Sequence, residues 1–297
     1  MMRTHIETME FPYGKITPTL PQGCIPYEQW PEFKLEALPQ PFCNPVAVGH
    51  SPKGVRWSFW PLTFEEYVSD QEPDLSVSDP HDTARYRFIM WRRVTTTRTP
   101  KGWWALSRAP SRVEGFIILR PDYWRTWSEN ARRQRKKWLT QIVHKTYTTE
   151  TVGLTEFEEA YKKSTVARST LRESIKIAKQ MEAASPGTVT YKVAKRLSDG
   201  AIKAGFAYID SSYAKSSYYA VGFYHKDTQD VPLTLGLIDE WFADAEKKGY
   251  RFLHLGQFWR PGESRAWKGF SLFKSKLNPI YIAYPPLLWR FARGKVF

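Results

Sequence analysis

The sequence predicts an α/β (α+β) fold: a mixed, largely antiparallel sheet flanked by helices, with a Pro-rich N-terminal extension. Two observations lead to this prediction. From residue 140 onward, β-favouring and amphipathic runs follow one another in the order β, α, α, β, β, β, α, β. Before residue 80, prolines interrupt the chain and no helical period is sustained. We therefore expect a Pro-rich acidic arm over 1–80, a short β-rich connecting segment over 81–120 and the main domain over 121–297.

The composition is that of a globular protein with an excess of positive charge. The chain has 297 residues, 42% hydrophobic and 25% charged, enough for one large core or two smaller ones. Its net charge is +14, but residues 1–80 hold five Lys or Arg against 11 Asp or Glu, so the basic surface belongs to the later part of the chain. Such a surface favours polyanionic partners: nucleic acid, anionic lipid or phosphate-bearing substrates.

The sequence also argues against several classes of protein. Cys24 and Cys43 are the two cysteines, which favours a reducing compartment, and no Cys/His grouping has zinc spacing, so we expect no metal. The N-terminus lacks a secretory signal, and no apolar run approaches the roughly 20 residues of a membrane span. We therefore expect a cytoplasmic protein. No P-loop, paired-carboxylate or Ser-His-Asp pattern supports an NTPase or a hydrolase.

The N-terminal arm contains one expected helix, and a strand follows it. The helix begins at Thr63, because Glu65 and Glu66 would then lie in its first turn, where acidic side chains are favoured. Residues 85–94 carry β-favouring side chains throughout and predict a strand. An acidic, turn-rich linker joins the two elements.

Two shorter strands are expected next, over residues 103–108 and 113–119. Trp91, Trp103 and Trp104 fall in or next to this region and have two interpretations. They form either a platform on which bases or sugars stack, or a small aromatic core. Large aromatic side chains more often pack in cores, so we favour the second interpretation.

A helical region rich in positive charge is expected from Pro121 onward. Tyr123, Trp127 and Trp138 are spaced to lie near one face, and cations crowd the other positions. The densest cations are Arg132, Arg133, Arg135, Lys136 and Lys137. They either contact the phosphates of a nucleic acid such as tRNA, with release of counterions, or form a solvated helix face.

The region from residue 141 to residue 278 contains the elements on which the functional interpretation depends. The expected strands cover residues 141–152, 188–197, 201–210, 216–225 and 250–256. The expected helices cover residues 154–168, 170–185 and 234–249, and a loop containing Trp and Gly closes the region. Three consecutive antiparallel strands thus lead through a helix to a further strand.

This order of elements resembles the GNAT acyltransferase superfamily, and the details resemble its Fem-type branch, the peptidoglycan aminoacyltransferase-like proteins. Three segments carry the resemblance. They are an aromatic-rich helix running into an Arg/Lys-rich one (121–142), a helix–Gly–strand unit (234–256) and the Gly–Phe–Lys motif of WKGFSLFKSKLNP (267–279). The order and spacing of these segments carry the resemblance more than any one of them does. The match covers residues 115–285 and leaves the arm unexplained.

The resemblance implies an enzyme that moves an acyl or aminoacyl group from acyl-CoA or aminoacyl-tRNA to an amine acceptor, with no permanently bound cofactor. One departure bears on the donor. The phosphate-binding (Q/R)xxGxG/A loop of ordinary acetyltransferases is absent, and DVPLTLG stands in its place. Acetyl-CoA is therefore not the default donor, although the backbone N–H groups at Pro232–Leu235 still offer an anion site.

Attack of an amine on an acyl carbonyl needs a hydrogen-bond donor for the developing oxyanion and a group that accepts the amine proton. Lys274 is the expected donor, reaching into an open cleft between strands, since the resemblance implies that such a lysine faces the acyl group. His254 and Asp210 are the candidate bases, although structural roles are common for both residue types. The expected substrate contacts are Gly222, Tyr224, Leu235, Gly236, Gly256, Trp259, Trp267 and Lys276.

Two other functions are compatible with the sequence. One is a non-catalytic nucleic-acid-binding protein that keeps the fold and uses the basic helix and the aromatic side chains. The other is a peripheral protein of anionic membranes, with PPLLWRFARGK (285–295) in the interface. An open cleft would favour the enzyme, and binding that weakens steeply with salt would favour the nucleic-acid-binding protein.

Overall fold

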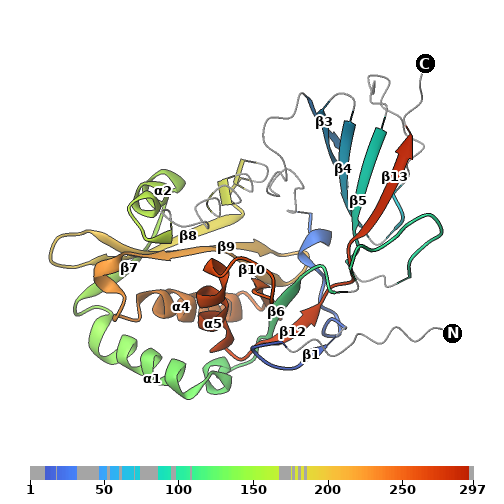
Figure 1. Cartoon of the computed structure of the whole chain (residues 1–297). Coiled ribbons are helices and arrows are strands. Elements are labelled where there is room, and N and C mark those ends of the chain that lie inside the picture. Colours follow the sequence, from blue (N-terminus) through green and yellow to red (C-terminus); the bar gives the residue numbers. More distant parts are fainter. Residues whose placement is uncertain are drawn as a thin grey trace.

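The strands of the protein form two sheets (Figure 1). The structure, a computed structural model, describes residues 11–17, 19–31, 47–51, 54–59, 62–69, 71–73, 86–94, 98–107, 109–166, 175, 178–179, 182–183 and 186–293. The larger sheet has the strand order β1 (Ile16–Thr17), β12 (Ile280–Ala283), β6 (Val113–Ile118), β11 (Phe252–Phe258), β10 (Ser216–Tyr224), β9 (Ile202–Ser211), β8 (Val189–Arg196) and β7 (Tyr147–Val152). The smaller sheet has the order β13 (Leu288–Arg293), β5 (Tyr86–Arg92), β4 (Leu62–Val68), β3 (Gly54–Phe59) and β2 (Ala47–Ser51).

The larger sheet is mixed and largely antiparallel, as the sequence predicts. β6, β7, β8 and β9 pair antiparallel with their neighbours, whereas β10–β11 and β1–β12 pair in parallel. A tight turn joins β8 to β9: Gly200 has a φ of 67°, and Arg196 forms an ion pair with Asp199.

Helices cover both faces of this sheet. Within the described residues they are α1 (Glu129–Lys137), α2 (Leu154–Lys162), α4 (Leu233–Lys247) and α5 (Ala266–Ser275). Successive side chains of a strand point to opposite faces. In β9, Phe206 accordingly packs in the core beneath α4, and Ala207 packs with Phe157 of α2 on the other face. In α4, Leu237 and Trp241 recur four residues apart and are fully buried, which explains why this amphipathic segment forms a helix against the sheet.

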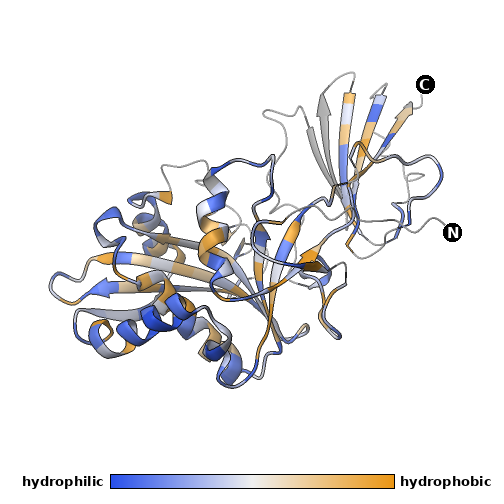
Figure 2. Cartoon of the chain, turned by 60° about the horizontal axis from the view of Figure 1, so that its bottom comes forward, coloured by the Kyte–Doolittle hydropathy of each residue, from blue (hydrophilic) through white to orange (hydrophobic). Residues whose placement is uncertain are grey.

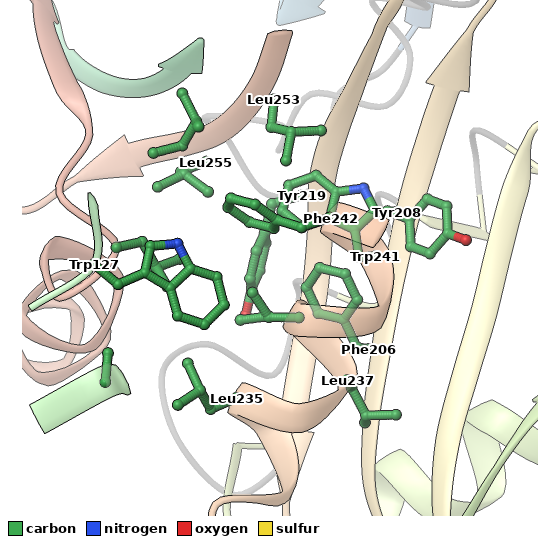
Figure 3. Close-up of a cluster of buried hydrophobic side chains, with 14 of the residues drawn as sticks. Trp127, Phe206, Tyr208, Tyr219, Leu235, Leu237, Trp241, Phe242, Leu253 and Leu255 are labelled. Carbon is green, nitrogen blue, oxygen red and sulfur yellow. The ribbon is translucent and has the colours of Figure 1, made fainter. Parts of the chain in front are cut away.

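The main core lies between α4 and the larger sheet (Figure 3). Trp241 contacts the rings of Phe206, Tyr208 and Tyr219 at centroid distances of 5.2, 6.0 and 6.4 Å. Its indole N–H donates to the Ser217 hydroxyl at 2.7 Å, so this buried polar group has a partner. Hydrophobic residues are concentrated in the sheet, whereas much of the flanking helices consists of hydrophilic residues, drawn in blue (Figure 2).

The residues from Thr63 onward form the strand β4, so the helix predicted there is wrong. β4 lies between β3 and β5. The carboxylate of Glu65 accepts two hydrogen bonds from Arg87, at 2.8 and 2.9 Å, and Glu66 pairs with Arg92. The acidic residues that suggested the first turn of a helix therefore bind cations of the neighbouring strand, a partnership that the local sequence does not reveal.

The tryptophans of this region pack mainly as a core, as favoured above. Trp91 and Trp103 are buried and in contact, with ring centroids 5.2 Å apart. Trp104 is 42% exposed and forms an isolated bridge with Trp289. The sequence predicts a strand over residues 103–108. Among its described residues, 103–107, only Trp104 takes part in β pairing, through that bridge.

The strand pairing crosses the expected domain boundaries. β6 comes from the expected connecting segment, yet it lies between β12 and β11 in the larger sheet. β1 pairs with β12, and β13, near the C-terminus, pairs with β5. The expected boundaries near residues 80 and 120 therefore do not separate the two sheets. Most of the helix expected over 170–185, and Cys43, lie outside the described residues.

Part of the segment that the membrane-surface alternative places in the interface forms β13. Leu288 is fully buried in a small cluster with Trp91 and Trp103, so its side chain packs inside the protein and does not face the surface. Within the described residues, no helix combines the length and apolarity needed to cross a membrane. The same residues bring together no group of three or more His, Cys, Asp or Glu side chains that could hold a metal ion.

Candidate functional site

β10 and β11 lie side by side in the middle of the larger sheet but pair over three residues only. Residues 216–218 pair in parallel with residues 252–254. Beyond this point the pairing of β10 with β9 is interrupted between Tyr219 and Val221, and that of β11 with β6 is interrupted just before Gly256. Gly256 has a φ of 68°, a left-handed conformation that favours glycine. The two strands therefore diverge at the centre of the sheet.

A cavity of about 600 Å³ lies beside the diverging end of β10, between that strand, the start of α4 and one side of α5. Four of the predicted contact residues line it: Gly222, Tyr224, Leu235 and Lys276. Its wall also includes Asp230, Thr234, Phe270 and Phe273. The expected site near the end of β10 thus coincides with a cavity, although Gly256, expected on its other side, does not line it.

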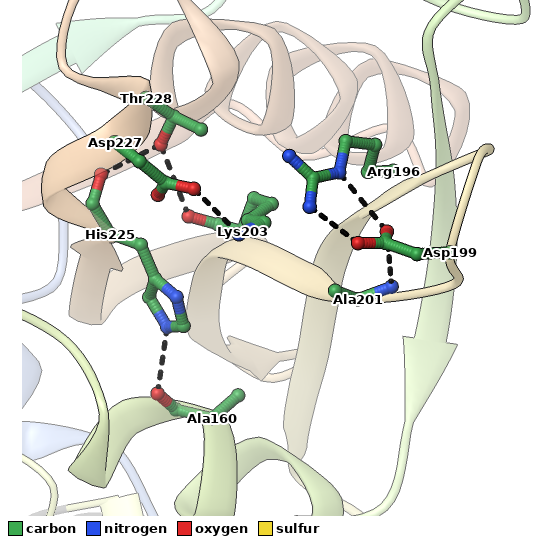
Figure 4. Close-up of polar contacts among 8 residues, drawn as sticks. All are labelled: Ala160, Arg196, Asp199, Ala201, Lys203, His225, Asp227 and Thr228. Atoms are coloured by element: carbon green, nitrogen blue, oxygen red, sulfur yellow. Dashed lines mark hydrogen bonds and ion pairs between the residues drawn. The ribbon is translucent and has the colours of Figure 1, made fainter.

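Polar contacts fix the wall between β10 and α4 (Figure 4). The Thr228 hydroxyl donates to the His225 carbonyl at 2.8 Å, and Lys203 binds Asp227 at 2.6 Å. The Nε2 atom of His225 lies 3.1 Å from the carbonyl oxygen of Ala160, at the end of α2. These contacts tie the connecting loop to β9 and α2, and so position residues 228–232 at the cavity.

The N-terminus of α4 faces the cavity. Its N-cap residue, Pro232, makes no side-chain hydrogen bond to the helix. The first N–H groups of an α-helix have no partner within the helix and carry partial positive charge. Thr234 and Leu235, in this first turn, line the cavity together with Lys276, and Phe270 gives it an apolar side. The cavity therefore suits a ligand that has both an anionic group and an apolar part.

Lys274 does not line the cavity. Its side chain is 2% exposed, and its ammonium donates to the carbonyl oxygens of Leu255 and Gln257 at 2.8 and 2.6 Å. Both carbonyls lie on β11 beyond its pairing with β10, so Lys274 supplies donors where β10 has moved away. Burial lowers the pKa of Lys274 to about 7, and the charge of Glu114 opposes the shift. Lys274 therefore binds the diverging strand β11 and does not reach into an open cleft. The expectation that it faces the acyl group is corrected.

The two candidate bases also lie away from the cavity. His254 is fully buried on the opposite face of the sheet, in edge contact with the rings of Trp30 and Phe116. Burial lowers the pKa of His254 to about 3, so the imidazole is neutral near pH 7. Asp210 lies at the far end of β9 from the cavity, where its carboxylate binds Lys248 at 2.6 Å. Neither side chain is placed to accept a proton from a ligand in the cavity.

Four more predicted substrate contacts do not line the cavity. Gly236 faces Trp138, and a Cβ at this position would overlap the indole, so the close approach is between two parts of the chain. Gly256 allows the irregular course of β11. Trp259 follows β11, and its indole N–H donates to the Glu263 carbonyl at 3.0 Å, whereas Trp267 lies in the first turn of α5.

α1 presents most of the predicted cations to solvent. The exposed ones are Arg132, Arg133, Lys136 and Lys137. Arg135 is partly buried and binds the buried Asp239 at 2.6 Å, so it anchors α1 to α4. Gln134, within the same run, lines the cavity. The positive surface of α1 therefore adjoins the cavity.

The helix α5 replaces much of the loop predicted after β11, and it brings residues that the prediction missed. Phe270, Phe273 and Leu277 have the spacing of one helical face, so a signal is present in the sequence, but Gly269 obscures it. Asp230 and Thr234 reach the cavity because the chain turns into α4 between them. Predicting that Asp230 and Thr234 line the cavity requires the position at which α4 begins.

No protein-family model matches the chain, and no curated protein matches it in sequence. Solved structures do match its fold. FemX matches with a TM-score of 0.58 at 11% identity, over 84% of this chain and 88% of that one. L-PGS from Bacillus licheniformis matches with a TM-score of 0.50 at 11% identity, over 82% and 83% of the two chains. A conserved protein of unknown function from Bacteroides thetaiotaomicron matches with a TM-score of 0.54 at 11% identity, over 80% and 82%.

At these identities the likeness concerns the fold. It extends over most of each chain, well beyond the region that carries the resemblance in sequence. The predicted order of elements is confirmed by the sheet, in which β8, β9 and β10 lead through α4 to β11. The protein thus shares its fold with FemX, in agreement with the GNAT-like α/β fold that the sequence predicts.

Proposed function

We propose that this protein is a Fem-like acyltransferase that transfers an acyl or aminoacyl group to an amine. One observation carries the proposal. β10 and β11 diverge at the centre of the sheet, and beside the divergence a cavity of about 600 Å³ meets the uncapped N-terminus of α4. The similarity of the fold to FemX and L-PGS supports the same class of reaction. We infer that the acyl end of the donor lies in this cavity, against β10.

The walls of the cavity offer what such a donor requires. The backbone N–H groups of Thr234 and Leu235, in the first turn of α4, and the Lys276 ammonium would hold a phosphate or another anionic group of the donor. Phe270 and Phe273 offer an apolar surface to the rest of the acyl or aminoacyl group. Holding the donor in one orientation makes attack by a bound amine effectively unimolecular, which contributes to the rate without a strong base.

Asp230 is our candidate for the group that accepts the amine proton. It is a carboxylate on the cavity wall, whereas His254 and Asp210, the bases expected from the sequence, lie elsewhere. A carboxylate can take the proton directly or through a water molecule as the new C–N bond forms. Asp230 lies just ahead of α4 and lines the cavity that we assign to the donor.

We favour aminoacyl-tRNA over acyl-CoA as the donor. The exposed cations of α1 adjoin the cavity at Gln134 and would meet the backbone of a nucleic acid whose acylated end is in the cavity. The start of α4 also lacks the glycine pattern of ordinary acetyl-CoA sites. A non-catalytic nucleic-acid-binding protein is the second candidate function, because the same cations favour it.

The deciding experiment asks which donor the protein retains and transfers. Native mass spectrometry with acyl-CoA thioesters and with charged and uncharged tRNA would identify the retained donor, and transfer to amines would then be followed. We expect Lys276→Ala to weaken donor binding roughly tenfold, because a hydrogen bond to a charged group contributes about 1.5 kcal/mol. Lys247→Ala, at the far end of α4, is the matched control and should bind normally.

Two results would count against the proposal. One is retention of charged and uncharged tRNA with equal affinity and no transfer to any amine, which favours the nucleic-acid-binding protein. The other is equal donor binding by Lys276→Ala and Lys247→Ala, which would remove the cavity from the donor site.

A further inference from the structure

Tyr219 carries a buried hydroxyl that has no hydrogen-bond partner among the described residues. The residue lies on β10 at its irregular point and is 4% exposed. Its ring makes edge contacts with Phe206 and Phe270, at centroid distances of 4.8 and 5.5 Å. Buried phenols usually find a partner, because an unpaired polar group in a core is unfavourable. An unpaired buried hydroxyl is therefore unusual and suggests a functional role.

The hydroxyl lies directly against Gly222, a residue of the cavity wall. Gly222, also on β10, lines the cavity, and a Cβ built on it would overlap the Tyr219 oxygen. The interrupted pairing between Tyr219 and Val221 puts Tyr219 and Gly222 on one face of the strand. The hydroxyl thus takes the space that a side chain at position 222 would fill. Phe270, which contacts the Tyr219 ring, lines the cavity as well.

The surroundings make this hydroxyl a donor. Burial raises the pKa of Tyr219, so the phenol keeps its proton at neutral pH. The ammonium of Lys274 lies 5.6 Å from the centre of the Tyr219 ring, but its hydrogen bonds go to backbone carbonyls of β11. Among the described residues the O–H of Tyr219 thus has no acceptor, and the nearest residue of the cavity wall in contact with it is Gly222.

We propose that Tyr219 donates its O–H to the carbonyl oxygen of the acyl group, an inference that rests on the proposed function. During transfer the amine nitrogen bonds to the carbonyl carbon, and the bond from that carbon to the ester oxygen or thioester sulfur breaks. The amine loses a proton, and the leaving oxygen or sulfur gains one. Tyr219 keeps its own proton and stabilises the negative charge on the carbonyl oxygen in the intermediate.

Tyr219→Phe, which removes one oxygen atom, tests the inference. Tyr123→Phe is the matched control, because that buried hydroxyl donates to the backbone and carboxylate oxygens of Asp239 at 2.9 and 2.8 Å. With the donor found by mass spectrometry, Tyr219→Phe should lower kcat roughly 100-fold and leave KM nearly unchanged, while Tyr123→Phe keeps its kcat. Without ligand, the Tm of Tyr219→Phe should equal or exceed that of the native protein, and the Tm of Tyr123→Phe should fall.

Two results overturn the inference and leave the proposed function intact. A lower Tm for Tyr219→Phe would reveal a structural partner for the hydroxyl, and an unchanged kcat would exclude a contact with the acyl carbonyl. If the native protein neither retains nor transfers any donor, the inference and the proposed function fail together.

Discussion

Lys274 and His254 are both buried, and burial changes what each side chain can do at neutral pH. An ionised group loses its hydration when buried, so the charged form is disfavoured. This lowers the pKa of His254 to about 3, and the imidazole packs as a neutral aromatic ring between Trp30 and Phe116. It lowers the pKa of Lys274 to about 7, so Lys274 changes its charge close to neutral pH.

The free energy of unfolding should therefore rise with pH above pH 7. The pKa of Lys274 is 10.5 as an ordinary lysine in the unfolded chain and about 7 in the folded protein. Between these two values the unfolded state binds more protons than the folded state. Raising the pH then favours folding, by up to about 1.4 kcal/mol per pH unit. Denaturant unfolding from about pH 7 to about pH 9.5 measures this slope, before the tyrosines ionise.

Lys274→Met removes the titrating group and should remove this slope. It should also lower stability at every pH, because the carbonyls of Leu255 and Gln257 lose their donor. Lys268→Met changes an exposed lysine of the same helix and should keep the native slope. The same pH dependence in native protein and Lys274→Met would mean that Lys274 keeps an ordinary pKa, contrary to the prediction.

At the scale of the elements, α4 depends on a close approach at Gly236. Trp138 begins the π-helical turn Trp138–Ile142 after α1, is 1% exposed and packs against this glycine. We expect Gly236→Ala to lower the free energy of unfolding by about 1–3 kcal/mol, because the new Cβ would overlap a rigid, enclosed indole. The loss should appear even though alanine favours a helix over glycine by about 1 kcal/mol.

Gly269→Ala in α5 is the control for this prediction. Nothing lies within 4 Å of the new Cβ, so this variant should be more stable by about 0.5–1 kcal/mol. Denaturant unfolding of the two variants gives both values. A stabilising effect of both substitutions would show that Trp138 can move away from α4.

Elements with local signals could be predicted, and elements defined by distant partners could not. In α4, Leu237 and Trp241 recur at helical spacing, and the sequence alone predicts the helix. In sequence, β4 resembles the start of a helix. In the folded chain its two glutamates bind Arg87 and Arg92, which lie 22 and 26 residues further along the sequence. Only the three-dimensional pairing explains why those acidic residues stand in a strand.

The same limit applies to the candidate site. Gly222, Tyr224 and Leu235 could be predicted, because the order of elements brings the end of β10 next to the start of α4. The surroundings of Lys274 could not, since they depend on where β10 and β11 stop pairing. Those of His254 depend on Trp30, more than 200 positions earlier in the chain, which packs on the opposite face of the sheet.

For the whole molecule, the acidic residues in the described part of the N-terminal arm bind the later, basic part of the chain. Glu28, Glu65 and Glu66 come from the first 80 residues, and all three are buried partners of later arginines. These arginines are thereby neutralised inside the protein. The cations of α1 differ, because they are exposed beside the cavity and only Arg135 is tied to a buried carboxylate. The four exposed cations of α1 are thus available to a polyanion.

Charge reversal on α1 tests whether this surface binds tRNA. Four exposed cations would change to Glu: Arg132, Arg133, Lys136 and Lys137. Each cation that contacts a phosphate releases a counterion, so the slope of log Kd against log salt should fall by about 3 when all four contacts are lost. Fluorescence anisotropy of labelled tRNA across a salt series gives the slope.

The control variant has the same change in net charge but replaces exposed cations outside α1, namely Lys101, Arg120, Lys226 and Lys247. It should keep most of the native slope. An equal decrease of the slope in the two variants would mean that tRNA responds to the total charge of the protein, and α1 would then not be a specific contact surface.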